Sequence, residues 1–97
     1  MFNTSLFKLN GEYVYFILPL KESAKYHTGS KVRFQVYIDE RCLGSFDKTL
    51  GIGRMYGKEK KLYHIILPLH FVQKTKLKIG SEVNIKSNER GINKNKD

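Results

Sequence analysis

The side chains that could take part in catalysis or hold a metal ion are few and widely spaced along this chain. The histidines His27, His64 and His70 lack the spacing of metal-ligand pairs, and Cys42 lies far from them in sequence. We therefore interpret the histidines as surface or strand residues. We expect no metal site and no cofactor.

Cys42 is the single cysteine, and it has two possible roles. Beside a histidine it could act as a nucleophile, but a lone cysteine in a predicted strand is more often a small core residue. The nine acidic residues are scattered and suggest no acid/base pair. The sequence thus predicts a protein without enzymatic activity. A small secreted domain usually carries several cysteines, so we expect a cytoplasmic location.

Residues 51–58 form a glycine-rich segment that invites comparison with a phosphate-binding loop. Such a loop needs a strand before it, a helix N-terminus after it and a Lys-Ser/Thr pair, which this segment does not offer. A glycine-rich hairpin is the better interpretation. It would bring Arg54, Lys58, Lys60 and Lys61 together as a candidate anion site.

The charge balance is strongly positive, with 18 Lys and Arg against 9 Asp and Glu, a formal net charge of +9. Such a field attracts nucleic acid, with duplex DNA the foremost candidate, or an acidic protein partner. An AT-rich genome would also enrich the chain in Lys, Ile and Asn without selection for binding. No apolar run approaches the roughly 18 residues of a membrane span, so we expect no membrane partner.

The candidate nucleic-acid contacts are the basic residues that strands and turns would bring together. Lys31 and Arg33 share one face of a predicted strand. Lysine outnumbers arginine 14 to 4, and bidentate recognition of guanine is mainly the work of arginine. We therefore expect phosphate contacts, weak sequence preference and steep salt dependence. The full candidate set is Lys31, Arg33, Arg54, Lys58, Lys60, Lys61, Lys74, Lys76 and Lys78.

Several tyrosines lie in the predicted strands and offer a second kind of contact. Their rings could stack on bases, as in proteins that bind single strands. Packing in or on the fold is the interpretation we favour. The tyrosines in question are Tyr13, Tyr15, Tyr37 and Tyr56.

The elements that must position these residues form an internal repeat. Both prolines of the chain, Pro19 and Pro68, stand in the tetrapeptide Ile-Leu-Pro-Leu, and Gly29 and Gly80 are each followed by serine. Proline would end one strand and begin one or two helical turns. Glycine would then turn the chain into a second strand. The helical turns are predicted at 20–26 and 69–75.

The segments around the repeat carry further strand and turn signals. Residues 31–38 alternate between apolar and polar side chains, which indicates a half-buried strand. A turn near Asp39 leads into another strand that ends about Thr49. Asn10 and Gly11 predict a tight hairpin turn near the start of the chain. Residues 88–97 have almost no apolar side chains and are predicted to be a disordered basic tail.

These elements predict one mainly β domain over residues 1–87, with repeat halves at about 11–38 and 60–87. Two such halves close most naturally into a small β-barrel with pseudo-two-fold symmetry, which would also remove exposed strand edges. We expect a monomer or a homodimer.

The paired pattern of Ile-Leu-Pro followed by Gly-Ser resembles the double-split, or swapped-hairpin, β-barrels. These include the AbrB and MazE type regulators and a neighbouring group of single-chain barrels of unknown function, which is the closer match. The AbrB resemblance implies DNA binding, usually by a dimer, through basic residues beside the first strand of each unit. Lys60 and Lys61 fit that position in the second copy, whereas Gly11 and Glu12 occupy it in the first. This asymmetry departs from the pattern expected for two-fold operator recognition.

Overall fold

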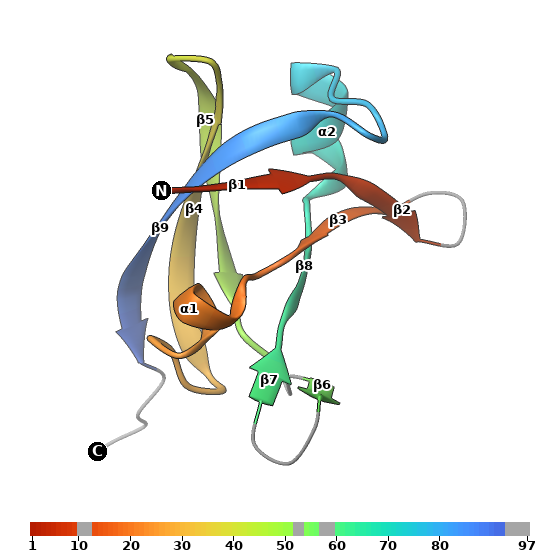
Figure 1. The fold of residues 1–97 in the computed structure, drawn as a ribbon. Coiled ribbons are helices and arrows are strands. Elements are labelled where there is room, and N and C mark those ends of the chain that lie inside the picture. Colours follow the sequence, from red (N-terminus) through yellow and green to blue (C-terminus); the bar gives the residue numbers. More distant parts are fainter. Residues whose placement is uncertain (10–12, 52–53, 57–59, 93–97) are drawn as a thin grey trace.

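The chain folds mainly as antiparallel β-sheet with two short helices (Figure 1). The computed structural model describes residues 1–9, 13–51, 54–56 and 60–92. The elements are β1 (Phe2–Ser5), β2 (Phe7–Leu9), β3 (Tyr13–Ile17), α1 (Leu20–Ser23), β4 (Ser30–Ile38), β5 (Arg41–Thr49), β6 (Arg54–Tyr56), β7 (Lys60–Leu62), β8 (His64–Ile66), α2 (Leu69–Thr75) and β9 (Glu82–Ile92). The predicted β class, with short helical turns after the two prolines, is confirmed. Within these residues, neither helix has the length and apolar character needed to cross a membrane.

Each helix starts directly after a proline, and each following strand starts just after a glycine. Pro19 and Pro68 are the N-cap residues of α1 and α2, where the missing N–H of proline costs the helix nothing. Gly29 and Gly80 have φ of 93° and 84°, a left-handed conformation that side chains disfavour. Both segments therefore run strand, proline, helix, glycine, strand.

The strands pair into three antiparallel sheets. The order is β1-β9-β4-β5 in the largest, β2-β3-β8 in the second and β6-β7 in the smallest. Across the part of the chain that is described, the three strand ladders stay separate and do not close into one barrel. The predicted mainly β class is thus present as three antiparallel sheets, without the closed barrel that the repeat suggested.

The two segments of the repeat pair with each other around equivalent residues. Phe16 on β3 pairs with Ile65 on β8, and these two residues hold the same position before each proline. Gln35 on β4 pairs with Lys86 on β9, and both lie six residues after the turn glycine. A pseudo-two-fold axis through both pairs therefore relates the two segments.

Reciprocal hydrogen bonds follow the same symmetry. The amide of Leu18 donates to the carbonyl of Tyr63 at 2.9 Å, and the amide of Leu67 donates to the carbonyl of Val14 at 2.8 Å. Leu18 and Leu67 are the residues before the two prolines, and Val14 and Tyr63 lie four residues earlier. Each copy thus holds the other by the same backbone contact.

The duplicated unit also includes strands that lie outside the predicted halves. Residues 2–6 and 46–50 read Phe-Asn-Thr-Ser-Leu and Phe-Asp-Lys-Thr-Leu, and they form β1 and the end of β5. Both lie at the edges of the four-stranded sheet. Leu6 exchanges backbone hydrogen bonds with the Gly80 turn, as Leu50 does with the Gly29 turn. The repeated pattern therefore extends two strands toward the N-terminus from each predicted half, to β1 and β2 in the first copy and to the end of β5 and β6 in the second.

A line of phenylalanines connects the sheets with α2 inside the core. Phe16 of β3 meets Phe34 of β4 edge-on, with ring centroids 5.5 Å apart. Phe34 lies 5.6 Å from Phe46 of β5, which in turn lies 5.2 Å from Phe71 of α2. All four rings are buried. One core is therefore shared by both copies.

Strand β9 is longer than the sequence predicts. It continues to Ile92 and pairs with β4 from Ser30 onward, so residues 88–92 are not part of a disordered tail. The polar composition led to the wrong prediction, because the side chains of residues 88–90 are exposed while backbone pairing with β4 holds the strand. Residues 93–97 lie outside the described part.

Candidate nucleic-acid interface

The solvent side of β4 and β9 carries a group of basic side chains. Val32, Phe34 and Val36 are buried, so the alternating residues Lys31 and Arg33 point away from the core. On the neighbouring strand β9, Lys86 pairs with Gln35, and Asn88 pairs with Arg33. We call Lys31, Arg33, Lys86 and Arg90 the basic face.

The carboxylate of Asp47 lies among the side chains of the basic face, and its pKa reflects their positive charge. Arg33 donates two hydrogen bonds to Asp47 of β5, from Nε to Oδ1 at 2.8 Å and from Nη2 to Oδ2 at 3.3 Å. The hydrogen bond from Arg33 lowers the pKa of Asp47 against a smaller opposing effect of burial, and the charges of Arg33, Arg90 and Lys31 lower it further. Because three cations surround one carboxylate, positive charge remains in excess.

The lysines near the second glycine turn form a separate group. Lys74 lies in the last turn of α2, and Lys76 caps that helix in the left-handed conformation with φ of 58°. Lys78 follows, and its backbone amide donates to Ser81 Oγ at 3.4 Å. Figure 1 places the end of α2 far from the start of β4, where Lys31 lies. The structure therefore does not join these lysines to the basic face.

The glycine-rich candidates fall on a hairpin. Arg54 lies in β6, Lys60 and Lys61 lie in β7, and the two strands pair antiparallel. A strand therefore follows this segment where a phosphate loop would need a helix, so the hairpin interpretation is correct. The side chains of these three residues lie outside the described part of the chain, as does all of Lys58.

Lys86 and Arg90, which complete the basic face, were not among the residues predicted from the sequence. The signal was present, because residues 82–88 alternate Glu-Val-Asn-Ile-Lys-Ser-Asn with the small or apolar side chains on one side. Assignment of residues 88–97 to a tail removed Arg90 from consideration. The bulge between Lys31 and Val32 shifts the register there, so alternation alone would not have placed Arg90.

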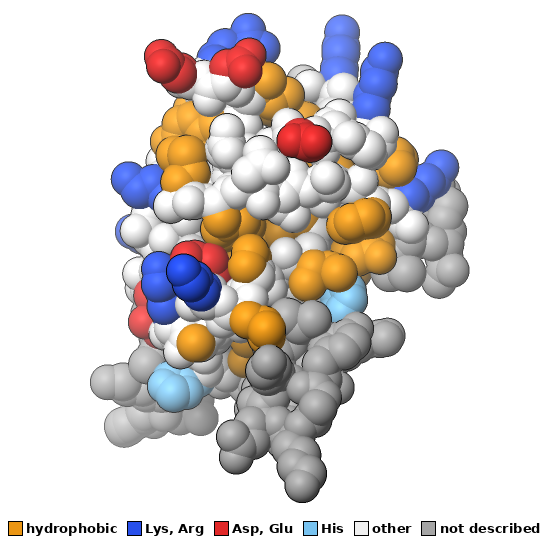
Figure 2. All heavy atoms as spheres, in the orientation of Figure 1, with side chains coloured by type: hydrophobic (Ala, Val, Ile, Leu, Met, Phe, Trp, Pro, Cys, Tyr) orange, Lys and Arg blue, Asp and Glu red, His pale blue; other side chains and the backbone are white. Residues whose placement is uncertain are grey.

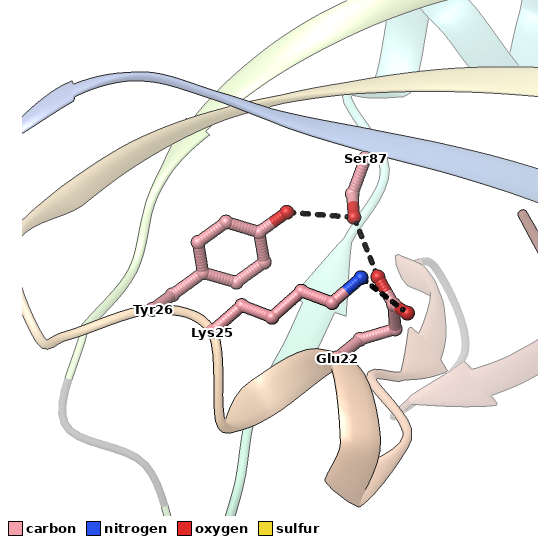
Figure 3. Close-up of polar contacts among 4 residues, drawn as sticks. All are labelled: Glu22, Lys25, Tyr26 and Ser87. Carbon is pink, nitrogen blue, oxygen red and sulfur yellow. Dashed lines mark hydrogen bonds and ion pairs between the residues drawn. The ribbon is translucent and has the colours of Figure 1, made fainter.

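A polar network fastens α1 to β9 (Figure 3). The hydroxyls of Tyr26 and Ser87 lie 2.8 Å apart, and Ser87 Oγ donates to Glu22 Oε1 at 3.0 Å. Lys25 Nζ donates to Glu22 Oε2 at 3.1 Å. Burial raises the pKa of Glu22, but the hydrogen bonds from Lys25 and Ser87 together bring it below the ordinary value. Because each of these polar groups hydrogen-bonds to another member of the network, we interpret the network as structural.

In the described part of the chain, Cys42 and the three histidines lie on different segments. Cys42 is exposed on β5, so its interpretation as a core residue is wrong: it pairs with Tyr37 on the outer side of a sheet edge. His27 and His70 are exposed, and His64 packs beside Tyr15 with ring centroids 5.6 Å apart. Among the residues that are described, no three His, Cys, Asp or Glu side chains gather as metal ligands would.

Comparison with protein families, with curated proteins and with solved structures gives no match to this chain. Its function therefore has to be argued from the residues themselves.

Proposed function

We propose that this protein binds nucleic acid without enzymatic activity and contacts mainly phosphates, with weak sequence preference. The observation that supports the proposal is the basic face, on which the cations of Lys31, Arg33 and Arg90 act on the carboxylate of Asp47 and Lys86 lies beside Gln35 on the neighbouring strand. Exposed cations on adjacent strands neutralise phosphates and release counterions. The polar neighbours Gln35 and Asn88 add hydrogen-bonding capacity to the same surface.

The duplicated topology supports a relation to the swapped-hairpin barrels. Two segments of the same element order pair with each other around a pseudo-two-fold axis at Phe16 and Gln35, as the resemblance implies. We propose that the fold is a degenerate member of that group, with the sheets arranged around one core. The basic face differs from the AbrB pattern, because its lysines belong to β4 and β9, the strands that follow the helix in each unit.

Titration of labelled duplex DNA and of a single strand at two salt concentrations tests the proposal. If about three phosphates are neutralised, the logarithm of the affinity falls with the logarithm of salt concentration with a slope near −3 for a duplex. Lys31→Gln or Lys86→Gln should each reduce that slope by about one unit. The matched control is Lys21→Gln, an exposed lysine of α1 that lies off the basic face.

Absence of binding to either nucleic acid at low salt would overturn the proposal. In that case, the basic face would fit the alternative role, an accessory domain that meets an acidic protein. Equal effects of Lys21→Gln and Lys31→Gln would instead show that net charge, rather than the basic face, governs binding.

A further inference from the structure

The outer side of the three-stranded sheet is apolar and largely aromatic. Phe16 and Ile65 are buried beneath it, so the alternating residues of β3 and β8 face outward. Figure 2 shows hydrophobic side chains gathered over β2, β3 and β8, next to a histidine. We call Phe7, Tyr13, Tyr15 and His64 the aromatic face; Ile17 and Ile66 flank its rings on the same side.

The rings of the aromatic face form a continuous row across the strands. Phe7 of β2 lies 5.6 Å from Tyr15 of β3, which lies 5.6 Å from His64 of β8. Tyr13 stands two residues before Tyr15, about 7 Å away along the strand. Phe7 is 44% exposed and Tyr13 is 51% exposed, because the register of β2 and β3 places both on the outer side of the sheet. The row thus presents open ring surface to solvent.

The charges of the molecule indicate what covers these rings. Strands β2, β3 and β8 contain no acidic residue, and the chain as a whole carries +9. Self-association of two copies at this face would bring like charges together. A polyanion with flat apolar groups avoids that cost, because its phosphates are attracted and its bases have π-faces that stack on aromatic rings.

We propose that the aromatic face binds the unpaired bases of a single-stranded nucleic acid. This inference rests on the proposed function and names its substrate class. Bases in a duplex are stacked on each other and cannot reach Tyr13 or Phe7, whereas a single strand can turn its bases outward. The basic face then contributes phosphate attraction that does not depend on strandedness, and the aromatic face provides the preference for single strands.

The test compares a labelled oligothymidine strand with a hairpin duplex of equal phosphate number, by fluorescence anisotropy at low salt. Tyr13→Leu keeps an apolar side chain but removes the ring, and it should weaken strand binding about tenfold while duplex binding stays unchanged. Tyr13→Phe keeps the ring and should retain the affinity. Leu69→Ala, at an exposed apolar residue of α2, is the control for loss of exposed apolar surface elsewhere.

Each other outcome contradicts a defined part of the inference. Equal strand affinity for Tyr13→Leu and Tyr13→Phe would overturn base stacking, while sensitivity to Lys31→Gln would leave the proposed function intact. Strand binding that depends on Tyr13 but not on Lys31 would instead remove the basic face from the proposed function. Sedimentation velocity adds the last test: a dimer that dissociates in the Tyr13→Leu variant would assign the aromatic face to a second copy.

Discussion

The candidate interface depends on single residues that alternate along neighbouring strands, and this alternation was only partly predictable. Lys31 and Arg33 were found because β4 alternates cleanly with buried Val32 and Phe34. On β9, Lys86 was missed although residues 82–88 alternate, and Arg90 was missed because the polar composition after residue 87 indicated a disordered tail. Local sequence does not show that β9 pairs with β4, so Arg90 could not have been assigned to the basic face.

The acid within the basic face should oppose nucleic-acid binding. Asp47→Asn removes its negative charge and frees Arg33 from the hydrogen bonds at 2.8 and 3.3 Å. We expect affinity for nucleic acid at low salt to rise roughly two- to fivefold, the range for one exposed charge. Anisotropy titration measures the change, with Asp39→Asn at the distant β4–β5 hairpin as the control. A fall in affinity would show that Arg33 needs Asp47 to hold it in place.

Glu22 should contribute to the acid sensitivity of the fold. Its folded pKa lies below the ordinary value, because the hydrogen bonds from Lys25 and Ser87 outweigh the effect of burial. A lowered carboxyl pKa adds stability that is present above the unfolded pKa, about 4.3, and is lost as pH falls through the folded value. Melting temperature of Glu22→Gln should therefore depend less on pH below about 5 than that of the original chain. Parallel curves from pH 3 to 7 would contradict a role for Glu22.

The two helices show how copies of one element have diverged. Glu22 of α1 and Phe71 of α2 both lie three residues after their proline, and one joins a polar network while the other enters the core. The strand residues seven positions after each turn glycine differ in the same way: Ser87 on β9 donates a hydrogen bond to Glu22, and its equivalent on β4 is the buried Val36. Polar contacts therefore hold α1 against the sheet, whereas apolar packing holds α2.

Close packing of α2 against β5 should make Gly44 sensitive to substitution. Gly44 has φ of 145°, and a Cβ there would lie 3.1 Å from Cε1 of the buried Phe71. Gly44→Ala should lower the free energy of unfolding by about 1–3 kcal/mol, since backbone strain and crowding act together. Gly51→Ala is the matched control, because no heavy atom lies within 4 Å of its Cβ position. Urea unfolding measures both, and equal small losses would contradict the packing argument.

The elements themselves were largely predictable because their signals are local. Proline and glycine impose their backbone conformations wherever they occur, so the corners at Pro19 and Pro68 and the turns at Gly29 and Gly80 could be found from sequence. Strand β1 was missed, although residues 2–6 match 46–50 in type. Residues 2 and 46 are 44 positions apart, whereas the two prolines are 49 apart, so the second copy has five more residues between these points and a single offset does not align both.

At the scale of the molecule, the duplication accounts for both the single core and the two distinct surfaces. Pairing of β3 with β8 and of β4 with β9 joins the copies in two different sheets, so neither copy can bury its apolar residues alone. The residues on the outer sides of these two sheets do not contribute to the shared core, so their chemical character can differ between the sheets. One carries the basic face and the other the aromatic face, as the alternation of each strand dictates.

Because both sheets share the core, the chain should unfold in one cooperative step. Ile65 on β8 is 3% exposed and Ile85 on β9 is fully buried, and they belong to different sheets. Ile65→Val and Ile85→Val should each lower the free energy of unfolding by about 0.5–1.5 kcal/mol. Each should also shift a single urea transition that circular dichroism and tyrosine fluorescence report at the same midpoint. Two separate transitions, with each variant moving only one of them, would mean that the sheets fold independently and that the copies do not share a core.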